Sequence, residues 1–195
     1  MKNIFIKPIV FMTLSLAVFT SCVKEDDYAI PTINPPLFKD GFESSWNSWT
    51  KISLVGSQEW TLDTQYGNPR NCATMSGFQS GSGSNVNEDW LISPVIDLST
   101  AENATLTFET ASRFSGNLLE VKISSDYNEG NPNIANWTDL SAVLDTNTNN
   151  FIWTNSGNID ISSFTGGNIH LAFRYTSTSS ASTTWEVDNI IITKN

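Results

Sequence analysis

The sequence is poor in the residues that zinc enzymes and nucleophilic enzymes need, with one histidine and two cysteines among 195 residues. A catalytic zinc site uses two or three His or Cys ligands. A Ser-His-Asp triad would have to use His170, which no nucleophile-elbow motif accompanies. A phosphate-binding loop is also missing, because no helical pattern follows the SGSGSN run at residues 80–85. The composition argues against these enzyme classes and favours a solvated surface position for His170.

Basic residues are scarce as well. The chain has 10 Lys and Arg against 20 Asp and Glu, which gives a formal net charge of −10. Proteins that bind nucleic acids contact phosphates through basic patches, and the sequence has none. We therefore expect no nucleic-acid partner, whereas the excess of carboxylates favours divalent cations as ligands.

Long hydrophobic runs are missing except near the N-terminus, where an apolar run at 9–19 follows two lysines. The run is too short for a stable membrane span, and with the small residues after it predicts a secretory signal peptide over residues 1–21. The triplet Thr20-Ser21-Cys22 resembles a bacterial lipobox, although Phe19 stands where Leu or Val is usual. We expect Cys22 to be lipidated and to anchor the chain in outer-membrane lipid without spanning the membrane.

The acidic run KEDD at 24–27 resembles the export signal of Bacteroidota surface lipoproteins. It implies an outer-membrane location that faces outward at the cell surface; a solvated linker is the alternative. Residues 22–36 are polar and proline-rich, which predicts a flexible tether before one folded domain at 37–195. Without the two lysines of the signal peptide, eight basic residues remain against 20 acidic ones, a formal charge of −12. Cys72 then has no partner for an internal disulfide and is expected to be a small buried side chain.

The folded part shows the two-residue alternation of β-strands. Between residues 168 and 193 two such stretches are joined by a Ser/Thr loop, and we interpret them as a hairpin of two long strands. The first alternates apolar residues with His170 and Arg174, and the second carries Asp188 inside its apolar run. The apolar positions are Ile169, Leu171, Phe173 and Tyr175 in the first stretch and Trp185, Val187, Ile190, Ile191 and Ile192 in the second.

About ten short strands with turn signals between them predict an all-β fold, an antiparallel β-sandwich of the jelly-roll type. Pro94 interrupts the strand DWLISPVIDLS and predicts a sheet edge or a crossing between sheets. A cluster rich in Gly, Ser, Asn and Gln within residues 64–88 predicts a long mobile loop or a hairpin tip. No amphipathic helix is evident. Further strands are expected near 51–55, 59–62, 71–75, 105–109, 118–123, 151–154 and 159–161.

The strand motifs resemble those of the choice-of-anchor J and cleaved-adhesin domains of Bacteroidota surface proteins, and of the related MAM domains. The resemblance extends over about residues 37–193, and DWLISP is its most specific part. It is carried by Phe42-Glu43 with Trp46 or Trp49 after it, by Asp89 to Ser99, by Leu119 to Ser124 and by Ala172 to Ile190.

Asp188 needs a partner, because a bare carboxylate inside a buried strand costs several kcal/mol. The resemblance implies a structural calcium ion that ties the first strand to the last, held by Glu43 and Asp188, with Asp40 and Asp63 as further candidates. Calcium prefers several carboxylate and carbonyl oxygens, which fits this set. The alternative is that backbone amides or Arg174 satisfy Asp188.

The seven tryptophans offer apolar faces on which sugar rings can stack. Trp60, Trp153 and Trp185 lie in strand-like stretches and are expected in the core. The candidates for a ligand-binding surface are in loops, although loop tryptophans also plug the open end of a sandwich: Trp46, Trp49 and Trp137.

A glycosidase is the enzyme class that a jelly roll most readily suggests. The string Trp185-Glu186-Val187-Asp188 is similar to the catalytic strand of laminarinase-type enzymes. Retaining hydrolysis needs two carboxylates about 5 Å apart, but Ile190 and Ile191 occupy the positions of a second glutamate. The motif is broken, so we expect no catalysis.

These observations predict a non-catalytic surface lipoprotein whose calcium-stabilised jelly-roll domain binds a glycan or a host or matrix protein. The alternative is a structural accessory subunit of an outer-membrane uptake complex. Exposed aromatic side chains favour the first function, and a flat apolar patch favours the second.

Overall fold

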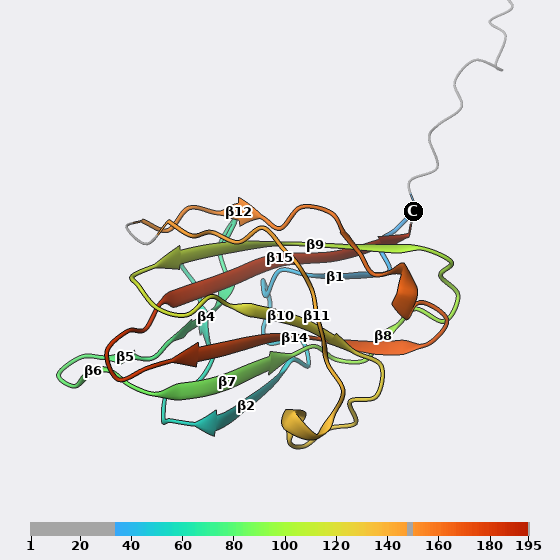
Figure 1. The fold of residues 1–195 in the computed structure, drawn as a ribbon. Helices are drawn as coiled ribbons and strands as arrows, with labels where there is room; N and C mark the ends of the chain where they lie inside the picture. The colour runs from blue at the N-terminus through green and yellow to red at the C-terminus, as the bar shows by residue number, and fades with distance from the viewer. Residues whose placement is uncertain (1–33, 148–149, 195) are drawn as a thin grey trace, which may run out of the picture. The chain divides into compact units, whose positions relative to one another are not determined.

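The computed structural model describes residues 34–147 and 150–194 (Figure 1). The predicted signal peptide, the lipidation site Cys22 and the tether up to residue 33 lie outside the described residues. Within the described ranges, no helix is long and apolar enough to cross a membrane. The N–H group of Leu37 donates to the carbonyl of Ile192 (2.8 Å), at the point where the sequence predicts that the domain begins.

The described residues form strands of 2 to 11 residues and two single-turn 3-10 helices, as expected from a sequence without amphipathic helices. The 3-10 helices are η2 (Pro132–Ile134) and η3 (Ser162–Phe164). The strands are β1 (Phe38–Asp40), β2 (Thr50–Val55), β3 (Thr61–Asp63), β4 (Cys72–Ser76), β5 (Phe78–Gln79), β6 (Gly83–Ser84), β7 (Asn87–Ile92), β8 (Ile96–Asp97), β9 (Ala104–Arg113), β10 (Glu120–Ser124), β11 (Thr138–Asp139), β12 (Thr154–Asn155), β13 (Ile159–Asp160), β14 (Asn168–Ser177) and β15 (Thr184–Lys194).

Two antiparallel sheets pack face to face, which confirms the predicted β-sandwich of jelly-roll type (Figure 1). The seven-stranded sheet has the order β12-β9-β15-β4-β3, with β1 also paired to β15 and β13 to β9. The six-stranded sheet has the order β11-β10-β14-β7-β2, with β8 also paired to β14. A small hairpin, β5-β6, stands apart from both.

The two long C-terminal strands do not form the predicted hairpin. β14 pairs with β10 and β7 in the six-stranded sheet, whereas β15 pairs with β9 and β4 in the seven-stranded sheet. The loop at 178–183 therefore crosses from one sheet to the other. The physical reason is burial: each strand has one apolar row, and the two rows are buried best when they face each other across the core.

One local prediction also changes, and another is confirmed. Pro94 does not mark a crossing between sheets, because β7 and β8 on either side of it both pair with β14. Ser93 fills the gap, donating its N–H to the carbonyl of Leu171 and accepting the N–H of Leu171 through Oγ (both 2.9 Å). The predicted strand near 71–75 is confirmed as β4, and the Gly- and Ser-rich cluster after it forms the predicted hairpin tip, β5-β6.

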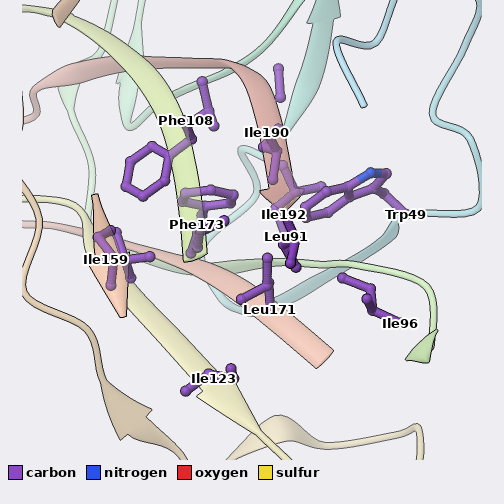
Figure 2. Packing of buried hydrophobic residues seen from close by; sticks show 14 of the residues in the cluster. Trp49, Leu91, Ile96, Phe108, Ile123, Ile159, Leu171, Phe173, Ile190 and Ile192 are labelled. Carbon is purple, nitrogen blue, oxygen red and sulfur yellow. The ribbon is translucent and has the colours of Figure 1, made fainter. Parts of the chain in front are cut away.

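The core between the sheets is rich in aromatic side chains (Figure 2). Phe108 and Phe173, from opposite sheets, meet edge to face with ring centroids 5.3 Å apart. Trp60 and Trp185 are fully buried as predicted, whereas Trp153 is only half-buried. Burial of each large apolar side chain stabilises the fold by roughly 1.5–3 kcal/mol. Cys72 is buried and free, as the sequence predicts.

Candidate functional site

Asp40 organises the loop that follows the first strand. It is buried at the end of β1, where its Oδ1 accepts the N–H of Phe42 (2.8 Å) and the side-chain amide of Asn47 (2.9 Å). Its Oδ2 accepts the indole N–H of Trp49 (2.9 Å). Both carboxylate oxygens thus hold the loop closed, which gives Asp40 a structural role of its own.

The two tryptophans of this loop have different environments. Trp49 is only 5% exposed and stacks on Phe173 with ring centroids 6.1 Å apart, inside the core (Figure 2). The prediction that Trp49 contributes to a ligand surface is therefore corrected: its side chain belongs to the core. Trp46 is half-buried, its ring lies 5.9 Å from that of Phe42, and the Nζ of Lys51 lies 5.2 Å from its centroid.

Asp188 lies on the outer face of the seven-stranded sheet, because its neighbours Trp185 and Val187 fill the core side of β15. The carboxylate is completely buried. Its Oδ2 accepts the backbone N–H of Asn68 (2.7 Å) and its Oδ1 that of Asn189 (2.6 Å). These are backbone-amide partners, one of the two alternatives that the sequence left open.

Arg174, the other alternative partner, belongs to the six-stranded sheet and bonds to Glu88 and Glu120 there. It does not contact Asp188 in any described hydrogen bond or ion pair. The prediction that Arg174 lies near Asp188 is wrong, because it assumed that the two C-terminal strands pair in one hairpin.

Glu43 lies near Asp188, as the resemblance implies, although it is in the loop after β1 and not on the strand itself. A Cβ atom placed on Gly41 would lie 3.3 Å from Asp188 Oδ1, 3.5 Å from Asn189 Oδ1 and 3.9 Å from the Cγ of Glu43. Gly41 therefore leaves a small space onto which two side-chain oxygens converge. We call Glu43, Glu109 and Asp188 the acidic cluster.

The acidic cluster disfavours ionisation of its buried member. The pKa of Asp188 is raised to about 7: burial is the main cause, the charges of Glu43 and Glu109 add to it, and the hydrogen bonds from the two backbone N–H groups act in the opposite direction. Glu109 is partly compensated, because it accepts the side-chain amides of Asn68 and Asn189 (2.8 Å each).

Asp63, the remaining predicted metal ligand, stabilises a turn. Its Oδ1 accepts the N–H groups of Gln65 (2.7 Å) and Tyr66 (3.0 Å). Its charge acts on Glu186, whose pKa is raised to about 7 by burial and then by Asp63. Within the described ranges, no group of three or more His, Cys, Asp or Glu side chains is arranged to hold a metal ion.

The third predicted tryptophan, Trp137, lies on the outer face of the six-stranded sheet. The segment that contains η2 folds over this face (Figure 1). Trp137 is half-buried there, with its ring 5.4 Å from Trp90 and 5.4 Å from Tyr127. Its indole N–H donates to the carbonyl of Pro132 (2.9 Å), which fixes the ring.

The sequence did not indicate Trp90 and Tyr127 as residues of this site. Strand alternation could have found Trp90, because its neighbour Leu91 points into the core and Trp90 must then point out. Tyr127 lies in an irregular segment, for which the sequence holds no periodic signal. Beside it, His170 is half-buried rather than solvated: its ring meets Tyr127 edge to face at 5.1 Å, and its Nδ1 lies 2.8 Å from the carbonyl of Ser93.

Charged side chains cross this face from strand to strand, and we call them the charge ladder: Glu88, Arg174, Glu120, Lys122 and Asp139. Arg174 joins Glu88 (Nε to Oε1, 3.2 Å) to Glu120 (Nη1 to Oε1, 2.6 Å). Lys122 joins Glu120 (2.8 Å) to Asp139. The guanidinium of Arg174 also lies over the Trp90 ring, 5.6 Å from its centroid.

The ladder keeps its members charged. Burial by itself would raise the pKa of Glu88, but hydrogen bonds from Trp90 and Arg174 and the charge of Arg174 outweigh it, so that the pKa is lowered. Burial would lower the pKa of Lys122, and its bonds to Asp139 and Glu120 raise it instead.

An open hollow of about 340 Å³ lies between the ladder and the aromatic rings. Trp137 forms its apolar side, while Arg174, Lys122 and Asn133 bring N–H donors to it. Among the described residues, Asp89, Glu186 and Asp188 have a pKa raised to about 7, first of all by burial, and none of them lines this hollow. The hollow is therefore equipped for recognition by stacking and hydrogen bonding.

The fold is that of an all-β sandwich domain shared with adhesin domains of known structure. The K3 cleaved adhesin domain of Lys-gingipain from Porphyromonas gingivalis W83 has a TM-score of 0.60 and 20% identity, over 82% of this chain and 100% of that domain. The K1 domain of the same protein has a TM-score of 0.58 and 19% identity, over 81% and 98%. The chain belongs to the family described as Domain of unknown function (DUF5017), whose model matches residues 95–195. No curated protein matches the sequence significantly.

Proposed function

We propose that the chain is a non-catalytic binding domain whose ligand is a glycan, recognised at the hollow beside Trp137. The observation that carries this proposal is the half-buried Trp137 ring, packed on Trp90 and Tyr127 and adjoined by Arg174 and Lys122. Aromatic rings bind the apolar face of a sugar, and ordered charged groups bind its hydroxyls. Adhesin domains of the same fold support a binding role.

Rigidity also supports recognition at this face. The indole N–H of Trp137 is bonded, and the ladder fixes Arg174 and Lys122 between carboxylates, so the groups need little ordering when a ligand binds. The hollow is small and concave, whereas a protein partner of ordinary size buries about 800 Å² on each side. A sugar chain fits these dimensions better than a protein surface.

The test is a glycan and matrix-protein array probed with the chain, followed by calorimetric titration of any glycan bound. We expect Trp137→Ala to weaken binding at least about tenfold. Trp153→Ala is the matched control, because Trp153 is also half-buried but does not line the hollow. A silent array, or binding unchanged in Trp137→Ala, would contradict the proposal and favour an accessory-subunit role.

We further propose that Glu43 and Asp188 hold a structural calcium ion in the space that Gly41 leaves, with the side-chain oxygen of Asn189 beside it. Two side-chain oxygens already converge on this space, and the proximity of Glu43 and Glu109 disfavours the charged form of Asp188. A cation would relieve that repulsion and tie the loop after β1 to β15. Asp40 and Asp63 are committed to turns and do not join this set.

Calcium at this site should stabilise the fold by RT ln(1 + [Ca²⁺]/Kd), about 2.7 kcal/mol at one hundred times Kd. We expect chelation to lower the melting temperature, and Glu43→Gln or Gly41→Ala to abolish that sensitivity. Glu59→Gln is the control, since its carboxylate pairs with Lys51 away from the cluster. A melting temperature that is the same with and without chelator would refute the calcium site. It would not bear on the proposed glycan binding.

The proposed setting is the outer surface of the outer membrane, reached through a lipid on Cys22. The lipobox-like triplet and the acidic run after it support this setting. Cys22→Ala should release the chain from the membrane fraction, and protease added to intact cells should digest the wild-type protein. Persistent membrane association of Cys22→Ala would contradict the anchor.

A further inference from the structure

A second cleft lies at one end of the sandwich, away from the hollow at Trp137. Three segments form it: the β5-β6 hairpin, the turn after β9 and the loop between β14 and β15, which come together at the same end in Figure 1. Its volume is about 320 Å³. Residues from all three segments line it: Phe78, Ser84, Phe114, Ser180, Ala181 and Ser182.

Two phenylalanines stand exposed at the cleft, against the usual tendency of large apolar side chains to be buried. Phe78 is 56% and Phe114 52% exposed. Phe114 has a φ of 71°, a left-handed conformation that is unusual for a bulky residue. The guanidinium of Arg113 lies over its ring, 5.0 Å from the centroid, and so covers one face while the other stays free. A strained, exposed and braced ring is a feature of a binding site rather than of packing.

The cleft is held in shape by contacts between its loops. Ser84 and Ser182 share a hydrogen bond between their Oγ atoms (2.9 Å). Gly116 lies so close to the β14–β15 loop that a Cβ atom there would meet the backbone N of Thr183 at 2.5 Å. The indole N–H of Trp185 donates to the carbonyl of Asn117 (3.1 Å) and ties the turn after β9 to the core. The site is therefore preformed, which reduces the entropy that a ligand must overcome.

The side chains that line the cleft indicate the chemical class of its ligand. The side chains that line the cleft are uncharged, and the charged group next to it, the guanidinium of Arg113, lies over the Phe114 ring. The lining therefore favours a neutral ligand. Aromatic rings on two sides and serine hydroxyls between them match a sugar ring, with its apolar C–H faces and its hydroxyl edge. The volume lies near the lower end of small-ligand sites, about 300–1,000 Å³. We propose that this cleft binds the neutral end of a saccharide, one or two rings long, between Phe78 and Phe114.

This second site extends the proposed function but does not depend on it, because it shares no lining residue with the hollow at Trp137. Two sites on one domain would allow a branched or long glycan to be held at separate points, with an avidity gain over either site.

Saturation-transfer NMR of the full-length chain tests the proposal, in a detergent without a sugar head group. The probes are cellobiose, lactose and α-1,6-mannobiose at millimolar concentration. We expect saturation transfer to the C–H protons of at least one disaccharide, reduced at least about fivefold by Phe114→Gly and by Phe78→Ala. Glycine accepts a positive φ, so Phe114→Gly removes the ring without straining the turn.

Two controls separate this proposal from the first. Ile134→Ala removes an exposed apolar side chain outside the cleft, and Trp137→Ala removes the ring of the other site. If saturation transfer persists in both controls and is lost in both phenylalanine variants, the result supports sugar binding at the cleft. If saturation transfer is lost in Trp137→Ala alone, the disaccharide binds at the hollow. That result would overturn the proposal for the cleft and would agree with the proposed function. No transfer from any of the three disaccharides overturns the cleft as a neutral-sugar site.

Discussion

On the outer face of the six-stranded sheet, charges alternate in sign across the strands, whereas on the outer face of the seven-stranded sheet carboxylates lie beside one another. The charge ladder pairs Arg174 and Lys122 with three acids. The acidic cluster is held by backbone and side-chain amides instead, and no ion pair among the described residues includes Asp188. Amide dipoles satisfy hydrogen bonds but do not cancel a negative charge. The charges of one face are therefore largely compensated within the protein, with two cations against three carboxylates, whereas no cation of the described residues pairs with the buried carboxylate of the other.

The largest expected effect is on stability as a function of pH. Two of the carboxyl groups responsible, Glu186 and Asp188, lie on the outer face of the seven-stranded sheet, whereas Asp89 lies on the core side of β7. Asp89, Glu186 and Asp188 have folded-state pKa values raised to about 7, so the folded state binds more protons than the unfolded state above pH 4. Their contribution is fully present below the unfolded pKa and is lost as pH rises through about 7. The full shifts would correspond to about 2–3 kcal/mol for each group over this range; relaxation and water penetration around the buried charges reduce this, so we expect the free energy of unfolding to fall by about 2–4 kcal/mol between pH 5 and 8.

Urea unfolding across this pH range measures the effect. With calcium added, the slope should become shallower, because a bound cation would favour the charged form of Asp188. A stability that rises steadily from pH 5 to 8 would show that the three carboxyl groups are ionised in the folded state.

The second effect concerns the ladder. Replacing Arg174 by Met leaves Glu88 and Glu120 without their shared cation on a half-buried face, and should cost about 1–2 kcal/mol at pH 7 after allowance for solvent screening. Lys51→Met is the matched control, since the exposed pair with Glu59 should contribute less than about 0.5 kcal/mol. Equal losses in the two variants would mean that the ladder behaves as ordinary surface charge.

The smallest effect comes from removing one charge of the opposite face. Glu186→Gln keeps the shape of a buried side chain whose Oε2 has no hydrogen-bond partner. It should stabilise the fold by about 1 kcal/mol at pH 8 and by almost nothing at pH 5, where Glu186 is already protonated. Chemical denaturation at the two pH values gives the comparison, and a loss of stability at pH 8 would show that the Glu186 charge is compensated.

The sequence predicted much of the fold because strand alternation is a local signal. The buried row of Leu106 and Phe108 and the position of the last two strands follow from it directly. The pairing of those strands does not follow from it. Two consecutive strands with one apolar row each can pair with each other in a hairpin or lie in opposite sheets, and the sequence pattern is the same in both cases. Topology depends on where the other strands lie.

The site was predictable only in part, for the same reason. The nearness of Glu43 to Asp188 followed from a resemblance, but the N–H that binds Asp188 comes from Asn68, 120 positions earlier. The cleft between Phe78 and Phe114 joins three loops that have no periodic pattern. The position of a tryptophan in a loop also did not predict its exposure, since Trp49 is buried and Trp137 is only half-buried.

The placement of β14 and β15 at the centres of different sheets has a consequence for folding during synthesis. Every other large strand pairs with one of these two or with a strand that does, and β1 itself pairs with β15 through Phe38 and Ile192. A nascent chain that lacks residues 168–194 can complete neither sheet. Folding of the two sheets must therefore wait until almost all of the domain has been made.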